Sequence, residues 1–218
     1  RQQHLRMQLR NPDTFRRPHM VPTLAYNQPQ YDSRGHYWLG SVWAPTNYMV
    51  VRGLMANRSL ALADTIAANH LQHLADVYFN FEPDENDIAF NERYADGYRT
   101  LWECYSPEYV KPATRWDNTF YSRQDFVGWT GLGPIAMLIE NIIGLEINGS
   151  ENTITWRLNR NDPHGLKNFL LKEQKVSLMY HEGVVEVECE TPFVLIIEWK
   201  GKTISMTMKA GQSKVVLS

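Results

Sequence analysis

The residue with the clearest potential for chemistry is Glu103, in the segment LWECYSP at residues 101–107. It stands between Trp102 and Tyr105 in a stretch without helical or strand periodicity. A carboxylate presented from a loop between aromatic neighbours is suited to act as a general acid or base. The alternative is a solvent-exposed glutamate, which is the usual position of this residue type.

Two further segments combine aromatic and polar residues, YWLGSVWAPTNY at 37–48 and QDFVGWTGLGP at 124–134. Tryptophan and tyrosine stack on sugar rings, whose C–H faces are apolar while their edges are polar. The same residue types are common in protein cores, Asn47 can cap a helix, and Asp125 can interact with a helix dipole. The candidates for substrate contact are Tyr37, Trp38, Trp43, Asn47, Tyr48, Asp125 and Trp129.

Other titratable residues are weaker candidates. Glu108 and Asp117 lie in the same loop as Glu103 and are rival carboxylates. The histidines show no metal-ligand spacing with carboxylates, so no metal and no other cofactor is expected. The acidic run at 82–87 is expected to be a solvated connection; a calcium loop is the alternative, but the central glycine of such loops is missing.

The order and spacing of the three segments resemble the C-terminal part of the six-hairpin glycosidases related to processing α-glucosidase I and trehalase. The matching residues are Tyr37-Trp38-Leu39-Gly40 with Trp43 and Asn47-Tyr48, then Glu103 with Tyr105 and Pro107, then Gly128-Trp129-Thr130. The resemblance covers roughly residues 12–145. Leu39 stands where many relatives have arginine, which leaves the substrate more open than the reaction class.

The resemblance implies an inverting glycoside hydrolase in which Glu103 is the general base and the aromatic residues bind an oligosaccharide or glycoside. Inversion needs an acid and a base whose carboxyl groups lie roughly 6.5–9.5 Å apart, so that a water fits between base and sugar. The family's general acid precedes the base by well over a hundred residues and has no counterpart in this chain. The chain is therefore expected to be inactive alone, to lack the N-terminal half of a barrel, and to be capable of self-association through exposed faces.

The fold expected from the sequence is mainly α, with helical hairpins of a partial (α/α)6 barrel in residues 1–147 and a small antiparallel β-sandwich in residues 148–218. Residues 1–10 resemble the end of a helix, and further helices are expected over about 45–56, 59–79 and 131–143, with a possible short one near 89–95. Ser59 and Thr130 are candidate caps. Short alternating segments begin at Thr153, and Gly183, Gly201 and Gly211 punctuate them at hairpin spacing.

The composition argues against two classes of protein, nucleic-acid binders and membrane-spanning proteins. The net charge is −2 with scattered basic residues, which is unlike the basic surface of a nucleic-acid binder, and no apolar run suggests a membrane segment. Cys104 and Cys189 are expected to be free thiols. A periplasmic or extracellular location is favoured over a cytoplasmic one. The alternative functions are a non-catalytic carbohydrate-binding or scaffold module, and a phosphorolytic enzyme or lyase.

Overall fold

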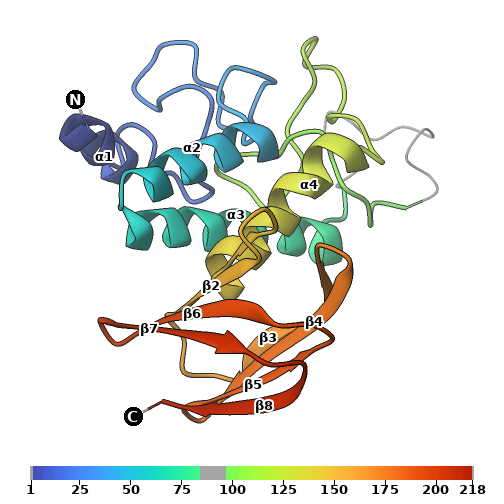
Figure 1. The fold of residues 1–218 in the computed structure, drawn as a ribbon. Coiled ribbons are helices and arrows are strands. Elements are labelled where there is room, and N and C mark those ends of the chain that lie inside the picture. The colour runs from blue at the N-terminus through green and yellow to red at the C-terminus, as the bar shows by residue number, and fades with distance from the viewer. Residues whose placement is uncertain (1, 84–96, 218) are drawn as a thin grey trace. The chain divides into compact units, whose positions relative to one another are not determined.

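The computed structural model describes residues 2–83 and 97–217. These form two compact units, residues 1–138 and residues 139–218, whereas the sequence placed the domain boundary after residue 147 (Figure 1). The short helix expected near 89–95 and most of the acidic run at 82–87 lie outside the described residues.

Unit 1 contains the helices α1 (Gln2–Arg10), α2 (Ala44–Ala56), α3 (Leu60–Asn80) and α4 (Val127–Met137). A connection of three residues, 57–59, turns α2 back onto α3, and both helices also pack against α4. The buried face of α3 follows the spacing of Ala63, Ile66, Ala67 and His70, as expected for an amphipathic helix. Ser59 precedes α3 but makes no side-chain cap; its hydroxyl accepts a bond of 3.1 Å from Arg6.

The fourth helix differs most from its prediction. It begins at Val127 rather than near residue 131, so Thr130 lies inside the helix and is not its cap. Pro134 lies within α4 and offers no amide for the helical ladder, and the helix continues as a π-helical segment, Leu138–Ile143. Gly133 faces α2, where a Cβ atom would lie 3.3 Å from the carbonyl oxygen of Ala44. A small residue at this point therefore allows the two helices to approach closely.

The expected fold class is wrong. Helices and strands each make up about 30% of the chain, so it is not mainly composed of helical hairpins of a barrel. Much of unit 1 consists of two long irregular stretches, residues 11–43 and 97–126, held together by isolated bridges such as Val42 with Tyr105 and His36 with Thr114. The proline and glycine residues that interrupt these stretches prevent sustained helix formation.

Unit 2 is built from eight described strands in two four-stranded sheets. One sheet has the order β1-β2-β6-β7 and the other β3-β4-β5-β8. Their bounds are β1 Leu145–Asn148, β2 Thr153–Leu158, β3 His164–Leu171, β4 Gln174–His181, β5 Val184–Cys189, β6 Phe193–Trp199, β7 Lys202–Met208 and β8 Gly211–Val216.

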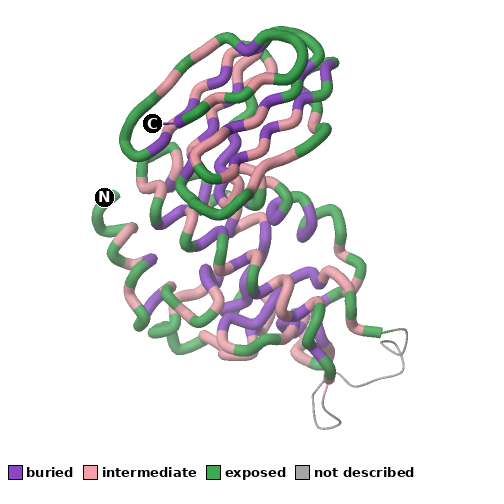
Figure 2. Tube along the Cα trace, turned by 90° about the horizontal axis from the view of Figure 1, so that it is seen from below, coloured by how far each residue is buried: buried purple, intermediate pink, exposed green. Residues whose placement is uncertain are grey.

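Side chains from both sheets share one core, centred on residues such as Trp156, Leu178 and Leu195. Buried residues alternate with more exposed ones along the strands (Figure 2). The sequence predicted a purely antiparallel β domain. This is wrong for β2 and β6, which pair in parallel. The chain passes through β3, β4 and β5 of the other sheet between them, and such a crossover can return it in the same direction.

The turns at Gly183 and Gly201 are two-residue hairpins, as the sequence predicted. Glu182 and Gly183 have φ angles of 47° and 82°, and Lys200 and Gly201 have 47° and 77°. Two successive positive φ angles define the type I′ turn, which favours glycine at its second position. The free, buried state of Cys104 and Cys189 also confirms the expectation for the cysteines.

Within the described part of the chain, none of the helices combines the length and the hydropathy that crossing a membrane would require.

Candidate functional site

The segment that carries Glu103 is fixed by its backbone. The amide of Glu103 donates to the carbonyl of Arg123 over 2.8 Å, and Tyr105 exchanges two hydrogen bonds with Val42, of 2.8 and 2.9 Å. Trp102 and Tyr105 are buried on either side and pack with Phe81 and Tyr121. The segment of Glu103 is therefore anchored to Arg123 of its own irregular stretch and to Val42 of the other.

Glu103 is a buried residue, only 6% exposed. The hydroxyl of Tyr37 donates to its Oε1 over 3.3 Å, a long bond for two oxygen atoms. Burial raises the pKa of Tyr37, and the negative charge of Glu103 raises it further. Tyr37 also has a φ angle of 47°, an unusual conformation for a bulky residue and one that is often retained at functional sites.

Tyr37, Trp38, Trp43 and Trp129 form what we call the aromatic cluster. Trp43 lies at its centre, stacked on Trp38 with ring centroids 4.1 Å apart and an interplanar angle of 2°. Tyr37 and Trp129 meet Trp43 edge to face, at 5.0 and 5.8 Å. Trp43 is fully buried, whereas Trp38 and Trp129 are 44% and 51% exposed. Trp38 and Trp129 therefore offer the accessible rings, and Trp43 supports them.

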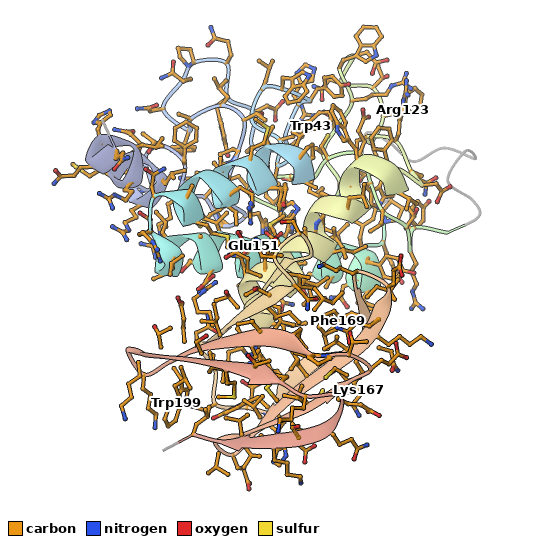
Figure 3. The ribbon with its side chains drawn as sticks, viewed as in Figure 1. Trp43, Arg123, Glu151, Lys167, Phe169 and Trp199 are labelled. Carbon is orange, nitrogen blue, oxygen red and sulfur yellow. The ribbon has the colours of Figure 1, made fainter. Side chains whose placement is uncertain are left out.

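Trp43 lies at the start of α2, and local contacts hold it there. Figure 3 labels Trp43 and also Arg123, which lies in the stretch before α4. The indole Nε1 of Trp43 donates to the hydroxyl of Ser41 over 2.6 Å. The close approach of α4 to α2 at Gly133 brings the first turn of α4, and so Trp129, to Trp43. The cluster thus depends on helix packing as well as on the aromatic residues.

Three other predicted site residues do not belong to the aromatic cluster. Asn47 is buried, and its amide group bonds the backbone N–H and carbonyl of Val21 at 2.7 and 3.1 Å, so it joins two segments of the core. Tyr48 packs against the helical core of unit 1. Asp125 is exposed and accepts a 2.6 Å bond from the hydroxyl of Thr100. Each has a structural contact that accounts for its residue type.

Glu108 is engaged in a partly buried ion pair. The guanidinium of Arg17 bonds both of its carboxylate oxygens, at 2.5 and 3.0 Å, and the hydroxyl of Tyr31 adds a bond of 2.7 Å. Burial, followed by the hydrogen bond and charge of Glu108, raises the pKa of Tyr31. Both carboxylate oxygens of Glu108 are therefore occupied by donors from the protein itself.

Asp117, the second rival, is paired with Arg115 at 2.7 and 2.9 Å. The hydrogen bonds from Arg115 lower its pKa well below the ordinary value for aspartate. Of these three carboxylates, Glu103 is the one that contacts the aromatic cluster.

Sequence reasoning missed two contacts around the site. Thr130 was expected to be a cap and part of the motif Gly128-Trp129-Thr130, but its hydroxyl donates to the carbonyl of Trp102 over 2.7 Å, next to Glu103. Arg17 was given no role, although its pair with Glu108 ties the first irregular stretch to the second. A signal for Thr130 was present in its position directly after Trp129, whereas the pairing of Arg17 with a residue 91 positions away leaves no local pattern.

The arrangement is suited to chemistry on a sugar. The carboxylate of Glu103 lies beside the hydroxyl of Tyr37. The ring of Tyr37 contacts Trp43, and Trp43 in turn contacts the half-exposed ring of Trp129. Such rings bind the apolar face of a pyranose, and a carboxylate can accept a proton from water. Among the described residues, no group of three or more histidine, cysteine or acidic side chains has the geometry of a metal site.

Comparison with known proteins agrees with this chemistry. Residues 1–109 match the family model described as the mannosylglycerate hydrolase MGH1-like glycoside hydrolase domain. An uncharacterized protein of Borreliella burgdorferi is 26% identical over 176 residues, which are 80% of this chain and 34% of that protein. The chain thus spans about a third of the length of this relative. No solved structure matches this chain significantly. Half of the chain is matched by the family model, and the chain therefore belongs to the MGH1-like glycoside hydrolase family.

Proposed function

We propose that this chain forms part of an inverting glycoside hydrolase and supplies its general base, Glu103. The observation that carries the proposal is the hydrogen bond between the carboxyl of the buried residue Glu103 and Tyr37 of the aromatic cluster. In the proposed reaction, Glu103 takes a proton from a water molecule that attacks the anomeric carbon. A separate acid protonates the leaving oxygen on the other face of the sugar.

The half-exposed rings of Trp38 and Trp129 are the proposed sugar platform. Trp43 supports both rings, and Tyr37 orients the carboxyl group of Glu103. We propose that the three matching segments bind the sugar and supply the base, as in the processing α-glucosidase I and trehalase-like group. The substrate is an oligosaccharide or glycoside, and mannosylglycerate and α-glucosides are the first compounds to assay.

The general acid is proposed to lie outside these 218 residues. The short coverage of the Borreliella burgdorferi relative, 34%, is consistent with this proposal. The chain alone is then inactive, while a longer protein that includes it is active. Turnover by the 218-residue chain at the rate of the longer protein would refute the divided site.

The decisive experiment is Glu103→Gln in the full-length protein, assayed with mannosylglycerate and α-glucosides. Loss of a general base lowers kcat by about 10³-fold, with substrate binding retained. Asp117→Asn is the matched control, since Asp117 is a carboxylate of the same stretch already paired with Arg115; it should leave kcat within a few-fold. Proton NMR of the first product reports the anomer, which should be opposite to that of the substrate.

Different outcomes support different alternatives. If Glu103→Gln leaves the rate unchanged, Glu103 is not the base. If no glycoside is turned over but sugar binding is lost in Trp129→Ala, the chain is a carbohydrate-binding module. Dependence of turnover on phosphate, or an unsaturated product, identifies a phosphorolytic enzyme or a lyase.

A further inference from the structure

Thr130 connects helix α4 to the backbone beside Glu103. Its hydroxyl donates to the carbonyl of Trp102 over 2.7 Å and lies 3.4 Å from the carbonyl oxygen of Glu103. Thr130 and Trp102 are both fully buried. The bond therefore lies in a water-poor environment, where a carbonyl left without its donor costs free energy.

This contact is unusual for a threonine within a helix. A helical threonine commonly bonds the carbonyl of the preceding turn of its own helix. Here the acceptor belongs to another segment, 28 positions away in the sequence. The Thr130 amide meanwhile bonds Phe126 in the ordinary helical manner, over 3.2 Å. The hydroxyl thus serves a contact between segments.

Other anchors of this segment come from later residues of the same irregular stretch. The amide of Glu103 bonds Arg123, and the carbonyl of Cys104 accepts bonds from the hydroxyl of Ser122 at 2.9 Å and the amide of Ala113 at 3.0 Å. Thr130 differs from them because it belongs to a helix. It also follows Trp129 directly, so the same turn of α4 carries an accessible ring of the aromatic cluster and the donor beside Glu103.

We propose that Thr130 is a positioning residue that sets the place of Glu103 relative to Trp129. This inference rests on the proposed function of Glu103 as the base. The hydroxyl of Thr130 does not touch the substrate; it fixes the peptide that precedes the base to the helix that carries the sugar platform. A displacement of about 1 Å between a catalytic group and its substrate can lower a rate by about 10²-fold.

The test compares Thr130→Val, which keeps the shape but removes the hydroxyl, with Thr130→Ser, which keeps the hydroxyl. In the full-length protein, Thr130→Val is expected to lower kcat by about 10²-fold while KM changes by less than about threefold. Thr130→Ser is expected to retain kcat within about fivefold. Equal losses in the two variants, or a rise in KM without a fall in kcat, would overturn the proposal.

A double variant tests whether Thr130 acts through Glu103. If it does, adding Thr130→Val to Glu103→Gln causes little further loss, because there is no longer a base to position. A full additional 10²-fold loss means that Thr130 acts independently, which contradicts the proposal. If Glu103→Gln alone leaves the rate unchanged, the proposed function fails instead.

Hydrogen exchange gives a readout that does not depend on activity. Backbone amides of residues 101–106 are expected to exchange at least tenfold faster in Thr130→Val than in the wild-type protein, and at the wild-type rate in Thr130→Ser. Peptides from α3 serve as the internal reference, since general destabilisation would accelerate their exchange as well. Unchanged exchange in residues 101–106 of Thr130→Val would show that the hydroxyl does not hold this segment.

Discussion

His70 is expected to make unit 1 sensitive to acid. It lies on the buried face of α3 with 1% exposure, and neither ring nitrogen has a hydrogen-bond partner among the described residues. Burial lowers its pKa from 6.5 to about 4. His73, one turn further along, stacks on His19 with centroids 3.5 Å apart, and burial together with these neighbouring histidines lowers its pKa to about 2.

The sign of the effect follows from the two states. The unfolded chain takes up a proton at His70 near pH 6.5, whereas the folded chain resists protonation until about pH 4. The stability conferred by the neutral ring is therefore complete above pH 6.5 and is lost progressively as the pH falls toward 4. At about pH 5 the loss is about 2 kcal/mol, because each tenfold rise in proton concentration costs about 1.4 kcal/mol in this range.

The perturbation that tests this reasoning is His70→Leu, which replaces the ring with an apolar side chain that favours helix formation. Denaturant unfolding is followed by tryptophan fluorescence at about pH 7.5 and pH 5. The fall in unfolding free energy between the two pH values should be about 2 kcal/mol smaller in His70→Leu than in the wild-type chain. His4→Leu is the matched control, since His4 is exposed on α1, and it should leave the pH dependence unchanged.

A pH dependence in His70→Leu equal to that of the wild-type chain would refute the reasoning. It would mean that the His70 ring is protonated as readily in the folded chain as in the unfolded one. The double variant with His73→Leu extends the test: the pH dependence should fall further, because a second buried ring no longer takes up a proton on unfolding.

Three other predictions concern stability. Glu108→Gln should lower the free energy of unfolding by about 2–3 kcal/mol, because it leaves the guanidinium of Arg17, whose side chain is only 16% exposed, without its counter-charge. In contrast, Asp162→Asn removes an exposed ion pair and should have no measurable effect in the same denaturation assay. Gly144→Ala should destabilise unit 2 by more than about 2 kcal/mol in thermal unfolding, since Gly144 has a φ angle of 86° and a Cβ atom would overlap the carbonyl oxygen of Arg157. A stable Gly144→Ala protein with an unchanged Tm would contradict that close approach.

Sequence alone predicted features whose causes are local. The apolar spacing of Ala63, Ile66 and Ala67 predicted α3, and the glycines at 183 and 201 predicted tight hairpins. Each of these signals depends on residues within a few positions of one another. The segment around Glu103 was recognised by the same kind of short motif, although its role as a base stays a prediction.

The fold class was mispredicted because local signals identify single helices but do not show how many helices a domain contains. Three well-marked helices, together with motifs of a helical family, suggested a barrel, but the irregular stretches 11–43 and 97–126 contain no helix among their described residues. They are held instead by scattered bridges between distant segments. The parallel pairing of β2 with β6 was missed for the same reason, since strand spacing does not specify strand order.

The amino-acid sequence by itself determined which residue types were available for chemistry: a carboxylate at 103 and several tryptophans and tyrosines. Only the tertiary structure decided which of them meet. Tyr37 reaches Glu103 across 66 positions, while Asn47 turns to the backbone of Val21 and Glu108 is held by Arg17. Such contacts depend on how segments pack in three dimensions, and packing between distant segments leaves no periodic trace along the chain.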